Sequence, residues 1–512
     1  MSKEQVIKGT LILTVTGVTC RFLGFLYKIW LSRALTPSCL GTYQLIFPIY
    51  GICHTIFASS IQTGISNISA GIDKTRHPLA AFRVGLLFSL TLATTLSIII
   101  FLSATPISQY IIMEPACAKY LKIISISFPF CAIYSCINGY YYGVRKTLTP
   151  ALSQLTDQCI RISIIFIIPL LAINNGIITG EIAIISLVIG EIAECMFTVI
   201  SFIFTTIKHP ITRIKNHTII YNSDIHKKIG LPMIKYCYPL LFSRLIISLL
   251  LTFEAVLIPI LLRSYGLNYN NSLTMYGILT GMALPFILFP NAFSSSYNLL
   301  MLSEIASAKA DNNTNKISKS ITISFTFAAK LGIISSCIFL VFGKDLGYQI
   351  FNNTSAGYLI SSLSIISIFM YISSIMSSVL NGLGFTKNTF YNSITSMILR
   401  LILTFHLIPI LGIGGYIISL FFSDGLLCIM NIRTIKKHIG FDMDLHTALI
   451  KPALSSITIT MCFYYFYICY IKPVIANVST ILSIFTLLGY CCLCIITIVL
   501  FTLRRSKNII NQ

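Results

Sequence analysis

Apolar stretches long enough to cross a lipid bilayer recur along the whole chain, a pattern that soluble folds do not have. A helix needs about 20 mostly apolar residues to span the hydrocarbon core. With this window the sequence predicts an all-α polytopic membrane protein with fourteen transmembrane helices. The predicted spans cover residues 9–32, 43–68, 80–104, 119–143, 152–174, 180–207, 230–262, 274–302, 318–343, 356–380, 390–411, 413–431, 449–471 and 476–503.

Composition supports this class and excludes several others. Hydrophobic residues make up 55% of the 512 residues, charged residues make up 10%, and the mean hydropathy is +0.85. Soluble domains carry about 25% charged residues, so a soluble enzyme, a disordered protein and a secreted disulfide scaffold are excluded. The net charge of +21 comes from small basic groups between apolar stretches. Without a continuous basic stripe, nucleic acid is not an expected partner.

The distribution of lysine and arginine predicts the topology. Cytoplasmic connections of membrane proteins are enriched in these residues. With the N-terminus in the cytoplasm, and with Arg83, Lys119, Lys319 and Lys451 at the span ends counted with the adjoining connections, the termini and the even-numbered connections hold 23 of the 36 basic residues. The odd-numbered connections hold 5, and 8 lie within spans. If one helix near the middle of the chain had been missed, the basic residues would be divided about equally between the two sets of connections. We therefore expect a protein of the cytoplasmic membrane with both termini in the cytoplasm.

Similarity between the two halves predicts a duplicated unit. Residues 138–146 (NGYYYGVRK) close the fourth span and residues 381–387 (NGLGFTK) close the tenth, and each is followed by a span that contains an arginine, Arg161 or Arg400. Internal repeats of this kind are typical of secondary transporters. We predict six-helix lobes over 1–207 and 230–440 around a central cavity, with a basic cytoplasmic linker over 208–229 and two further helices and a basic tail over 441–512.

Basic residues inside the predicted spans are candidates for binding an anionic cargo. Each costs roughly 2.5–3.5 kcal/mol at the centre of a bilayer, so they are expected to face water, pair with acids or reach the interface. Lys122 and Lys235 lie near span ends and are expected to reach the interface. The six predicted cavity cations are Arg21, Lys28, Arg161, Arg244, Lys330 and Arg400.

The first span places two of these cations on one helix face. Thr14, Gly17, Arg21, Gly24 and Lys28 recur at helical spacing. Small residues beside two cations predict a groove with positive charge at its floor. The alternative is helix packing through the small residues, with Arg21 bound to an acid elsewhere.

Acidic residues within spans are candidates for binding a coupling ion, either H⁺ or Na⁺. These are Glu254, Asp157 and Asp424, and Glu191 and Glu194 are further acids within a span. Asp157 and Arg161 are four residues apart, so pairing along one helix is the alternative for both. Basic residues outnumber acids within the spans, which favours an anionic cargo.

Motifs for enzymatic chemistry are missing from the sequence. No GxxxxGK[ST], HExxH or GxSxG motif occurs, and the one CxxC spacing, Cys491 to Cys494, lies inside an apolar predicted span. We therefore predict no catalytic, cofactor-binding or metal-binding residue, and we expect a secondary transporter that is not an enzyme. The expected partners are the substrate and membrane lipids, and the expected oligomeric state is a monomer.

Several segments resemble the oligosaccharide-flippase branch of the MOP superfamily, in particular its stage V sporulation protein B group. Residues 19–25 (TCRFLGF) are similar to the first-helix motif of that branch. Residues 138–143 and 150–158 (PALSQLTDQ) resemble its GYFQG and PTAxSQxxEQ elements, residues 381–384 its QGLG element, and residues 450–452 (IKP) the start of its thirteenth helix. Residues 60–70 depart from the group's second-helix pattern, and Asp157 stands where the group prefers glutamate.

This resemblance implies a carrier that moves a lipid-linked oligosaccharide across the cytoplasmic membrane by alternating access. The expected substrate is an undecaprenyl-pyrophosphate peptidoglycan precursor of the lipid II type, used for spore cortex or cell wall, and Arg21 would contact its pyrophosphate. Two alternatives stay open. One is a cation-coupled multidrug antiporter of the same superfamily, and the other is a polytopic membrane glycosyltransferase or ligase.

Overall fold

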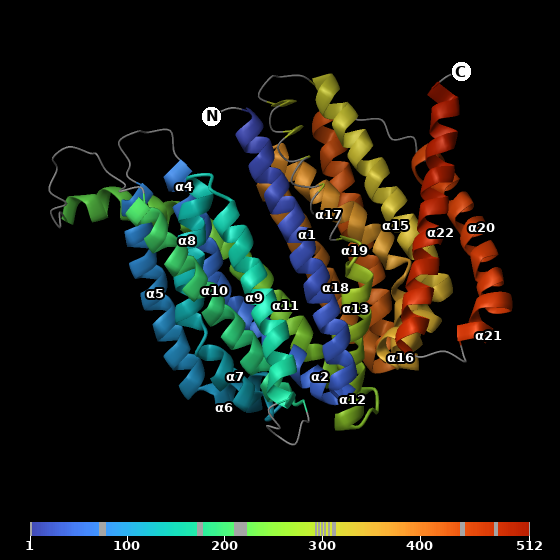
Figure 1. Cartoon of the computed structure of the whole chain (residues 1–512), viewed down its shortest axis with the longest axis horizontal. Helices are drawn as coiled ribbons and strands as arrows, with labels where there is room; N and C mark the ends of the chain where they lie inside the picture. The colour runs from blue at the N-terminus through green and yellow to red at the C-terminus, as the bar shows by residue number, and fades with distance from the viewer. Residues whose placement is uncertain are drawn as a thin grey trace. The chain divides into compact units, whose positions relative to one another are not determined.

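The structure is a computed structural model in which every secondary-structure element of the described residues is helical (Figure 1). It describes residues 3–70, 78–170, 178–208, 223–291, 314–440, 446–475 and 480–510, together with positions 294, 297, 301, 304, 305, 308 and 309. The all-α class predicted from the sequence is confirmed for these residues.

The helices form two compact units. The first comprises Met1–Tyr27 and Ala34–Ile260, and the second comprises Lys28–Arg33 and Leu261–Gln512. Most of the predicted linker, residues 209–222, lies outside the described residues. The lobe boundaries drawn from the sequence therefore stay a prediction.

The first unit contains most of α1 and the helices that follow it as far as α11. Their bounds are α1 Lys3–Ala34, α2 Pro37–Gln44, α3 Ile46–His54, the π-helical segment Thr55–Ser59, α4 Ser60–Ala70, α5 Pro78–Leu102, α6 Ala104–Pro106, the π-helical segment Ile107–Ile111, α7 Cys117–Ser125, α8 Phe128–Gly143, α9 Leu148–Leu170, α10 Gly180–Lys208 and α11 Ser223–Ser264.

The second unit contains the last residues of α11 and the helices after it. Their bounds are α12 Tyr269–Gly277, the π-helical segment Ile278–Ala283, α13 Leu284–Leu288, α15 Thr314–Phe351, α16 Thr354–Leu363, α17 Ile366–Gly382, α18 Thr386–Leu411, α19 Ile413–Ile439, the π-helical segment His446–Ile450, α20 Lys451–Phe466, the π-helical segment Tyr467–Ile471, α21 Lys472–Ile475 and α22 Thr480–Ile510.

Ten helices in the described part of the chain are long and apolar enough to cross a membrane. Two further pairs, α7–α8 and α16–α17, would each form one span bent by 47° or 56°, which gives up to twelve. A multi-pass membrane protein is thereby confirmed. Helices α1 and α22 lie over the first and last predicted spans but are not among these twelve, so the number fourteen stays a prediction.

The chain has the same backbone conformation where α8 and α17 end. Arg145, after α8, has φ 60°, and Gly384, after α17, has φ 82°. This left-handed conformation is common just beyond a helix C-terminus, usually at glycine. The same three backbone hydrogen bonds close both ends, so Arg145 corresponds to Gly384.

This correspondence fixes the register of the following helices. Arg161 of α9 lies sixteen residues after Arg145, and Arg400 of α18 lies sixteen residues after Gly384. The two arginines therefore occupy equivalent positions. In each unit the arginine-bearing helix packs against the next long helix, α9 against α10 and α18 against α19.

Candidate functional site

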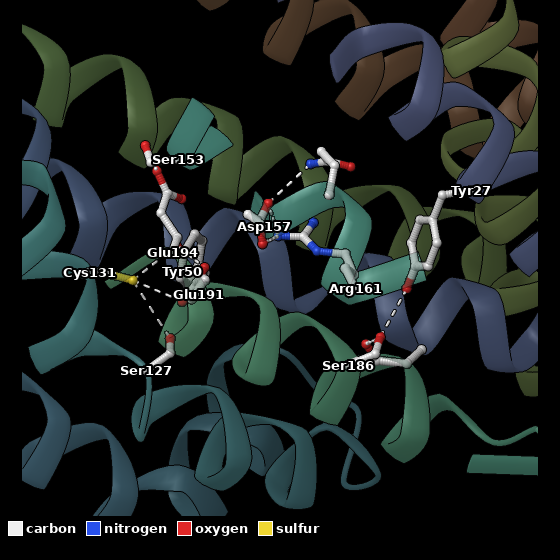
Figure 2. Close-up of polar contacts among 12 residues, drawn as sticks. Tyr27, Tyr50, Ser127, Cys131, Ser153, Asp157, Arg161, Ser186, Glu191 and Glu194 are labelled. Carbon is white, nitrogen blue, oxygen red and sulfur yellow. Dashed lines mark hydrogen bonds and ion pairs between the residues drawn. The ribbon is translucent and has the colours of Figure 1, made fainter. Parts of the chain in front are cut away.

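Asp157 and Arg161 form an ion pair along α9 (Figure 2). The Nη2 atom of Arg161 donates to Oδ1 and Oδ2 of Asp157 at 2.8 and 2.9 Å. The two side chains are only 18% and 10% exposed. Gly190 of α10 makes room for them, because a Cβ there would lie 2.5 Å from Oδ1 of Asp157. Pairing along one helix, the alternative predicted from the spacing, is the arrangement found.

Glu194 of α10 ends a chain of hydrogen bonds through three helices. The hydroxyl of Ser153 in α9 donates to Oε1 of Glu194 at 2.8 Å, and Nδ2 of Asn138 in α8 donates to the Ser153 oxygen at 3.3 Å. All three residues are buried. The chain fixes α8, α9 and α10 relative to one another through one ionisable group.

Glu191 lies one turn earlier on α10 and has a different set of partners. The hydroxyl of Tyr50 in α3 donates to Oε1 at 2.5 Å, and the thiol of Cys131 in α8 donates to Oε2 at 2.8 Å. Figure 2 shows Glu191, Glu194 and the Asp157–Arg161 pair in one part of the first unit. The helices of this unit thus bring three carboxyl groups and one guanidinium into a polar cluster.

Arg400 forms the corresponding ion pair in the second unit, but with a different helix. Its Nη2 atom lies 2.7 Å from Oδ1 of Asp424 in α19, and its Nε atom donates to the hydroxyl of Ser423 at 2.9 Å. The two charged side chains are 15% and 6% exposed. Two predicted site residues are therefore brought together, as a cation and its counter-ion.

A neutral version of the three-helix chain occurs in the second unit. Asn392 of α18 donates to Oδ1 of Asn431 in α19 at 2.9 Å, and Asn431 donates to the hydroxyl of Ser377 in α17 at 2.9 Å. Asn392 and Ser153 each lie eight residues after the left-handed residue of their unit. Asn431 thus takes the place that Glu194 has in the first unit.

Arg244 of α11 has partners of another kind. Its Nη1 atom donates to the carbonyl oxygen of Ser59 at 2.9 Å and to the hydroxyl of Thr63 at 3.3 Å. Both partners are neutral, and no described carboxylate pairs with this guanidinium. On the same helix, the predicted coupling residue Glu254 is 4% exposed.

The remaining predicted cations lie on α1 and α15. Arg21 and Lys28 are both exposed on α1. Of the small residues on the predicted face of α1, Gly24 lies beside α9, since a Cβ there would be 3.5 Å from Oε1 of Gln158, whereas the space next to Gly17 is open. Lys330 is half-buried in α15 and forms no hydrogen bond or ion pair with a described residue.

The acidic residues near the ends of the helices are either ion-paired with lysines or buried. Glu181 pairs with Lys119 at 3.3 Å, and Asp345 pairs with Lys472 at 2.8 Å. Glu114 is 3% exposed. Among the described residues, no group of three or more His, Cys, Asp or Glu side chains has the arrangement of a metal site.

Sequence reasoning named Glu191 and Glu194 as acids within a span but did not place them in the site. Their spacing of three on one helix puts them on the same face, which is the signal that could have done so. Their partners Tyr50 and Ser153 are ordinary residues of other helices, and nothing in the sequence marks them.

Comparison with known proteins identifies the family. Residues 6–290, more than half of the chain, match the family described as Polysaccharide biosynthesis protein. Stage V sporulation protein B of Bacillus subtilis (strain 168) is 24% identical over 473 residues, which are 90% of this chain and 89% of that protein. Sporulation protein YkvU of the same organism is 22% identical over 402 residues, which are 78% of this chain and 87% of that protein.

Solved structures of transporters have the same fold. The lipid II flippase MurJ in an inward closed conformation aligns with a TM-score of 0.66 at 13% identity, over 98% of this chain and all of that one. An inward-facing multidrug resistance MATE family transporter of the MOP superfamily aligns with a TM-score of 0.63 at 14% identity, over 84% of this chain and 98% of that one. The chain therefore belongs to the polysaccharide biosynthesis protein family, as its resemblance to the stage V sporulation protein B group suggested, and has the fold of MOP-superfamily transporters.

Proposed function

We propose that this protein is a flippase that moves a lipid-linked oligosaccharide across the cytoplasmic membrane by alternating access. Arg244 carries the proposal. It lies in an apolar span, and its described partners are neutral oxygen atoms. A cation inside a membrane is costly unless it is paired or wet, and an anionic head group would supply the missing negative charge.

The proposed substrate is an undecaprenyl-pyrophosphate precursor of the lipid II type, used for spore cortex or cell wall. The sporulation proteins and the lipid II flippase among the similar proteins support this choice. A guanidinium group binds phosphate oxygens with paired hydrogen bonds, which suits Arg244 to a pyrophosphate. Arg21, Lys28 and Lys330 complete the proposed set of cations. At Arg161 and Arg400 a phosphate would compete with Asp157 or Asp424.

The surroundings of the acidic residues near the helix ends favour a transporter over a glycosyltransferase or ligase. An enzyme of that kind needs an accessible carboxylate outside the membrane. Glu181 and Asp345 are each paired with a lysine, and Glu114 is buried.

The carboxyl groups inside the spans support coupling to H⁺ or Na⁺. Asp157 and Asp424 are ion-paired, whereas the described partner of Glu194 is a neutral hydroxyl group. We propose Glu254, which is buried in α11, and Glu194 as the first coupling carboxyls to test. The same acidic cluster is the observation that favours the second candidate function, a cation-coupled multidrug antiporter. A monomer with both termini in the cytoplasm completes the proposal.

Reconstitution of the full chain into liposomes separates these functions. Fluorescent lipid II, a teichoic acid precursor on the same lipid carrier and a fluorescent cationic drug are offered side by side, with protein-free liposomes as the background. The flippase proposal expects translocation of one or both lipid-linked saccharides and none of the drug. Transport of the drug alone would replace the proposal with the antiporter.

A further inference from the structure

A pocket of about 670 Å³ in the second unit has an arginine, two lysines and a histidine among its eight lining residues. It lies between the first turns of α18 and the last turns of α19. Asn388 and Asn392 line it from α18, and Arg433, Lys436, Lys437 and His438 line it from α19. The four basic side chains are all exposed.

The first unit has a pocket of about 550 Å³ in the equivalent place. Thr149 in this pocket and Asn388 in the basic one each lie four residues after the left-handed residue of their unit. Ile200 lies six residues after Glu194, and Lys437 lies six residues after the corresponding Asn431. The fold thus forms this pocket twice.

The two pockets differ in chemistry. The lining of the first from α10 includes Phe197, Ile200 and Phe204, and one basic residue, Lys146, is among its lining residues. The fold therefore does not require a basic lining at this place. The positive charge of the second pocket needs another explanation, and binding of an anion supplies one.

Contacts around the basic pocket hold part of its wall in place. The ring of His438 stacks on the ring of Phe385, with centroids 4.3 Å apart and an interplanar angle of 21°. Lys309 lies 5.6 Å from the same phenylalanine ring and donates to the carbonyl oxygen of Leu383. No side chain caps the N-terminus of α18, so its first amide groups add to the positive potential.

The positive charge of this pocket is not compensated by the described carboxylates of the second unit. Glu304 accepts from Ser320, Asp345 pairs with Lys472, and Asp424 pairs with Arg400. Each of these acids therefore has a partner outside the pocket.

The surroundings of the pocket favour a lipid over a soluble anion. The basic residues occupy the last turns of α19, at the end of the candidate span Ile413–Ile439, where a membrane head group is expected. Tyr391 of α18 is 66% exposed and Ile429 of α19 is 59% exposed, on the same helices next to the pocket. These side chains could pack along acyl chains while the basic residues bind the phosphate.

We propose that this pocket binds the phosphate head group of an anionic membrane phospholipid, separately from the transported substrate. Basic pockets between membrane helices commonly bind such head groups, and each lysine or arginine near the membrane surface contributes roughly fivefold in affinity. The lipid would bridge α18 and α19 at the ends where the pocket opens.

The test measures lipid binding to the full chain in detergent by native mass spectrometry. Phosphatidylglycerol, phosphatidylcholine and inorganic phosphate are added in separate arms. The triple variant R433Q/K436Q/K437Q removes three charges from the pocket. The matched variant R83Q/K235Q/K319Q removes three exposed charges near the starts of other candidate spans, so both variants have the same net charge.

Saturable binding of phosphatidylglycerol is expected for the wild type and the matched variant, with no comparable binding of phosphatidylcholine. Affinity in the pocket variant is expected to fall by roughly a hundredfold, from about fivefold for each charge. Equal losses in both variants would overturn the proposal, because charge alone would then explain the binding. Phosphate that binds as tightly as the lipid would also overturn it, in favour of a site for a soluble anion.

A folding defect in the pocket variant is detected by its thermal midpoint without added lipid. If that midpoint falls, H438Q and K437Q are tested as single variants at the same pocket. If both single variants are fully folded and bind phosphatidylglycerol as tightly as the wild type does, the proposal is contradicted.

Discussion

Arg161 and Arg400 occupy equivalent positions in the two units, yet they pair with carboxylates from different places. Arg161 bonds to Asp157 one turn earlier on its own helix, whereas Arg400 bonds to Asp424 on the neighbouring helix α19. The first pair is local to α9, and the second pair joins two helices. This difference leads to different expectations for their removal.

Asp424→Asn should destabilise the protein strongly. It leaves the guanidinium of Arg400 largely buried without its counter-ion, which typically costs about 3–5 kcal/mol. Thermal unfolding in detergent measures the change. Asp157→Asn is expected to lower the midpoint less, because its pair does not join two helices.

The double variant R400M/D424L controls for the loss of charge itself. Replacing both members of a buried pair by apolar residues is often neutral or stabilising. Its midpoint should therefore recover most of the loss seen for Asp424→Asn. A double variant as unstable as the single one would show that the pair is not the cause.

Gly190→Ala should disturb the polar cluster of the first unit. The new Cβ would lie 2.5 Å from Oδ1 of Asp157 and 3.2 Å from its carbonyl oxygen, and overpacking of this kind costs about 1–3 kcal/mol. Gly425→Ala in α19 is the matched control, because the space around its Cβ position is open for 4 Å apart from the adjacent residues and backbone of its own helix. The thermal unfolding midpoint of Gly190→Ala should therefore be lower than that of Gly425→Ala. Equal midpoints would mean that α9 and α10 can separate without cost.

Ser153→Ala should break the chain from Asn138 to Glu194. Both partners of the serine are buried, and a buried polar group left without a partner costs about 1–3 kcal/mol. Ser163→Ala, on the same helix, removes a hydroxyl that bonds to its own helix backbone at an exposed position, and it should have little effect. Unfolding by heat compares the two, and equal effects would refute a role for the chain.

The pair of Lys472 and Asp345 should contribute to stability at neutral but not at strongly alkaline pH. The hydrogen bond to Asp345 raises the pKa of Lys472 above its ordinary value. Because this pKa is raised on folding, the pair contributes fully to stability below the pKa of lysine in the unfolded chain, about 10.4. The contribution is lost as the pH rises through the pKa of Lys472 in the folded protein. The stability difference between wild type and K472M should be constant from about pH 6 to 9 and shrink above about pH 10. A difference that grows with pH would contradict this assignment.

The sequence predicted what depends on local periodicity. Apolar stretches placed the helices, and the spacing of four predicted the pair of Asp157 and Arg161. It could not predict that Asp424 reaches Arg400, because this contact depends on the packing of α18 against α19. The bond from Tyr50 to Glu191 depends on tertiary packing in the same way.

The register of the repeat was also beyond the sequence. Asparagine and glycine at 138–139 and 381–382 suggest one alignment, but the left-handed residues Arg145 and Gly384 require another. Because one of these two positions is an arginine and the other is a glycine, their shared backbone conformation cannot be recognised from residue type. The pairing of Glu194 with Asn431 as equivalent residues became visible only through this register.

Translocation of labelled lipid II by Arg244 variants in liposomes measures whether this cation binds the head group that crosses the membrane. Arg244→Lys keeps the charge and Arg244→Gln removes it, while Arg83→Gln serves as the exposed control. With equal amounts of folded protein, we expect activity in wild type, Arg83→Gln and Arg244→Lys, and a loss of at least tenfold, about 1.4 kcal/mol, in Arg244→Gln. Undiminished translocation by Arg244→Gln would contradict the claim that this cation binds the anionic head group.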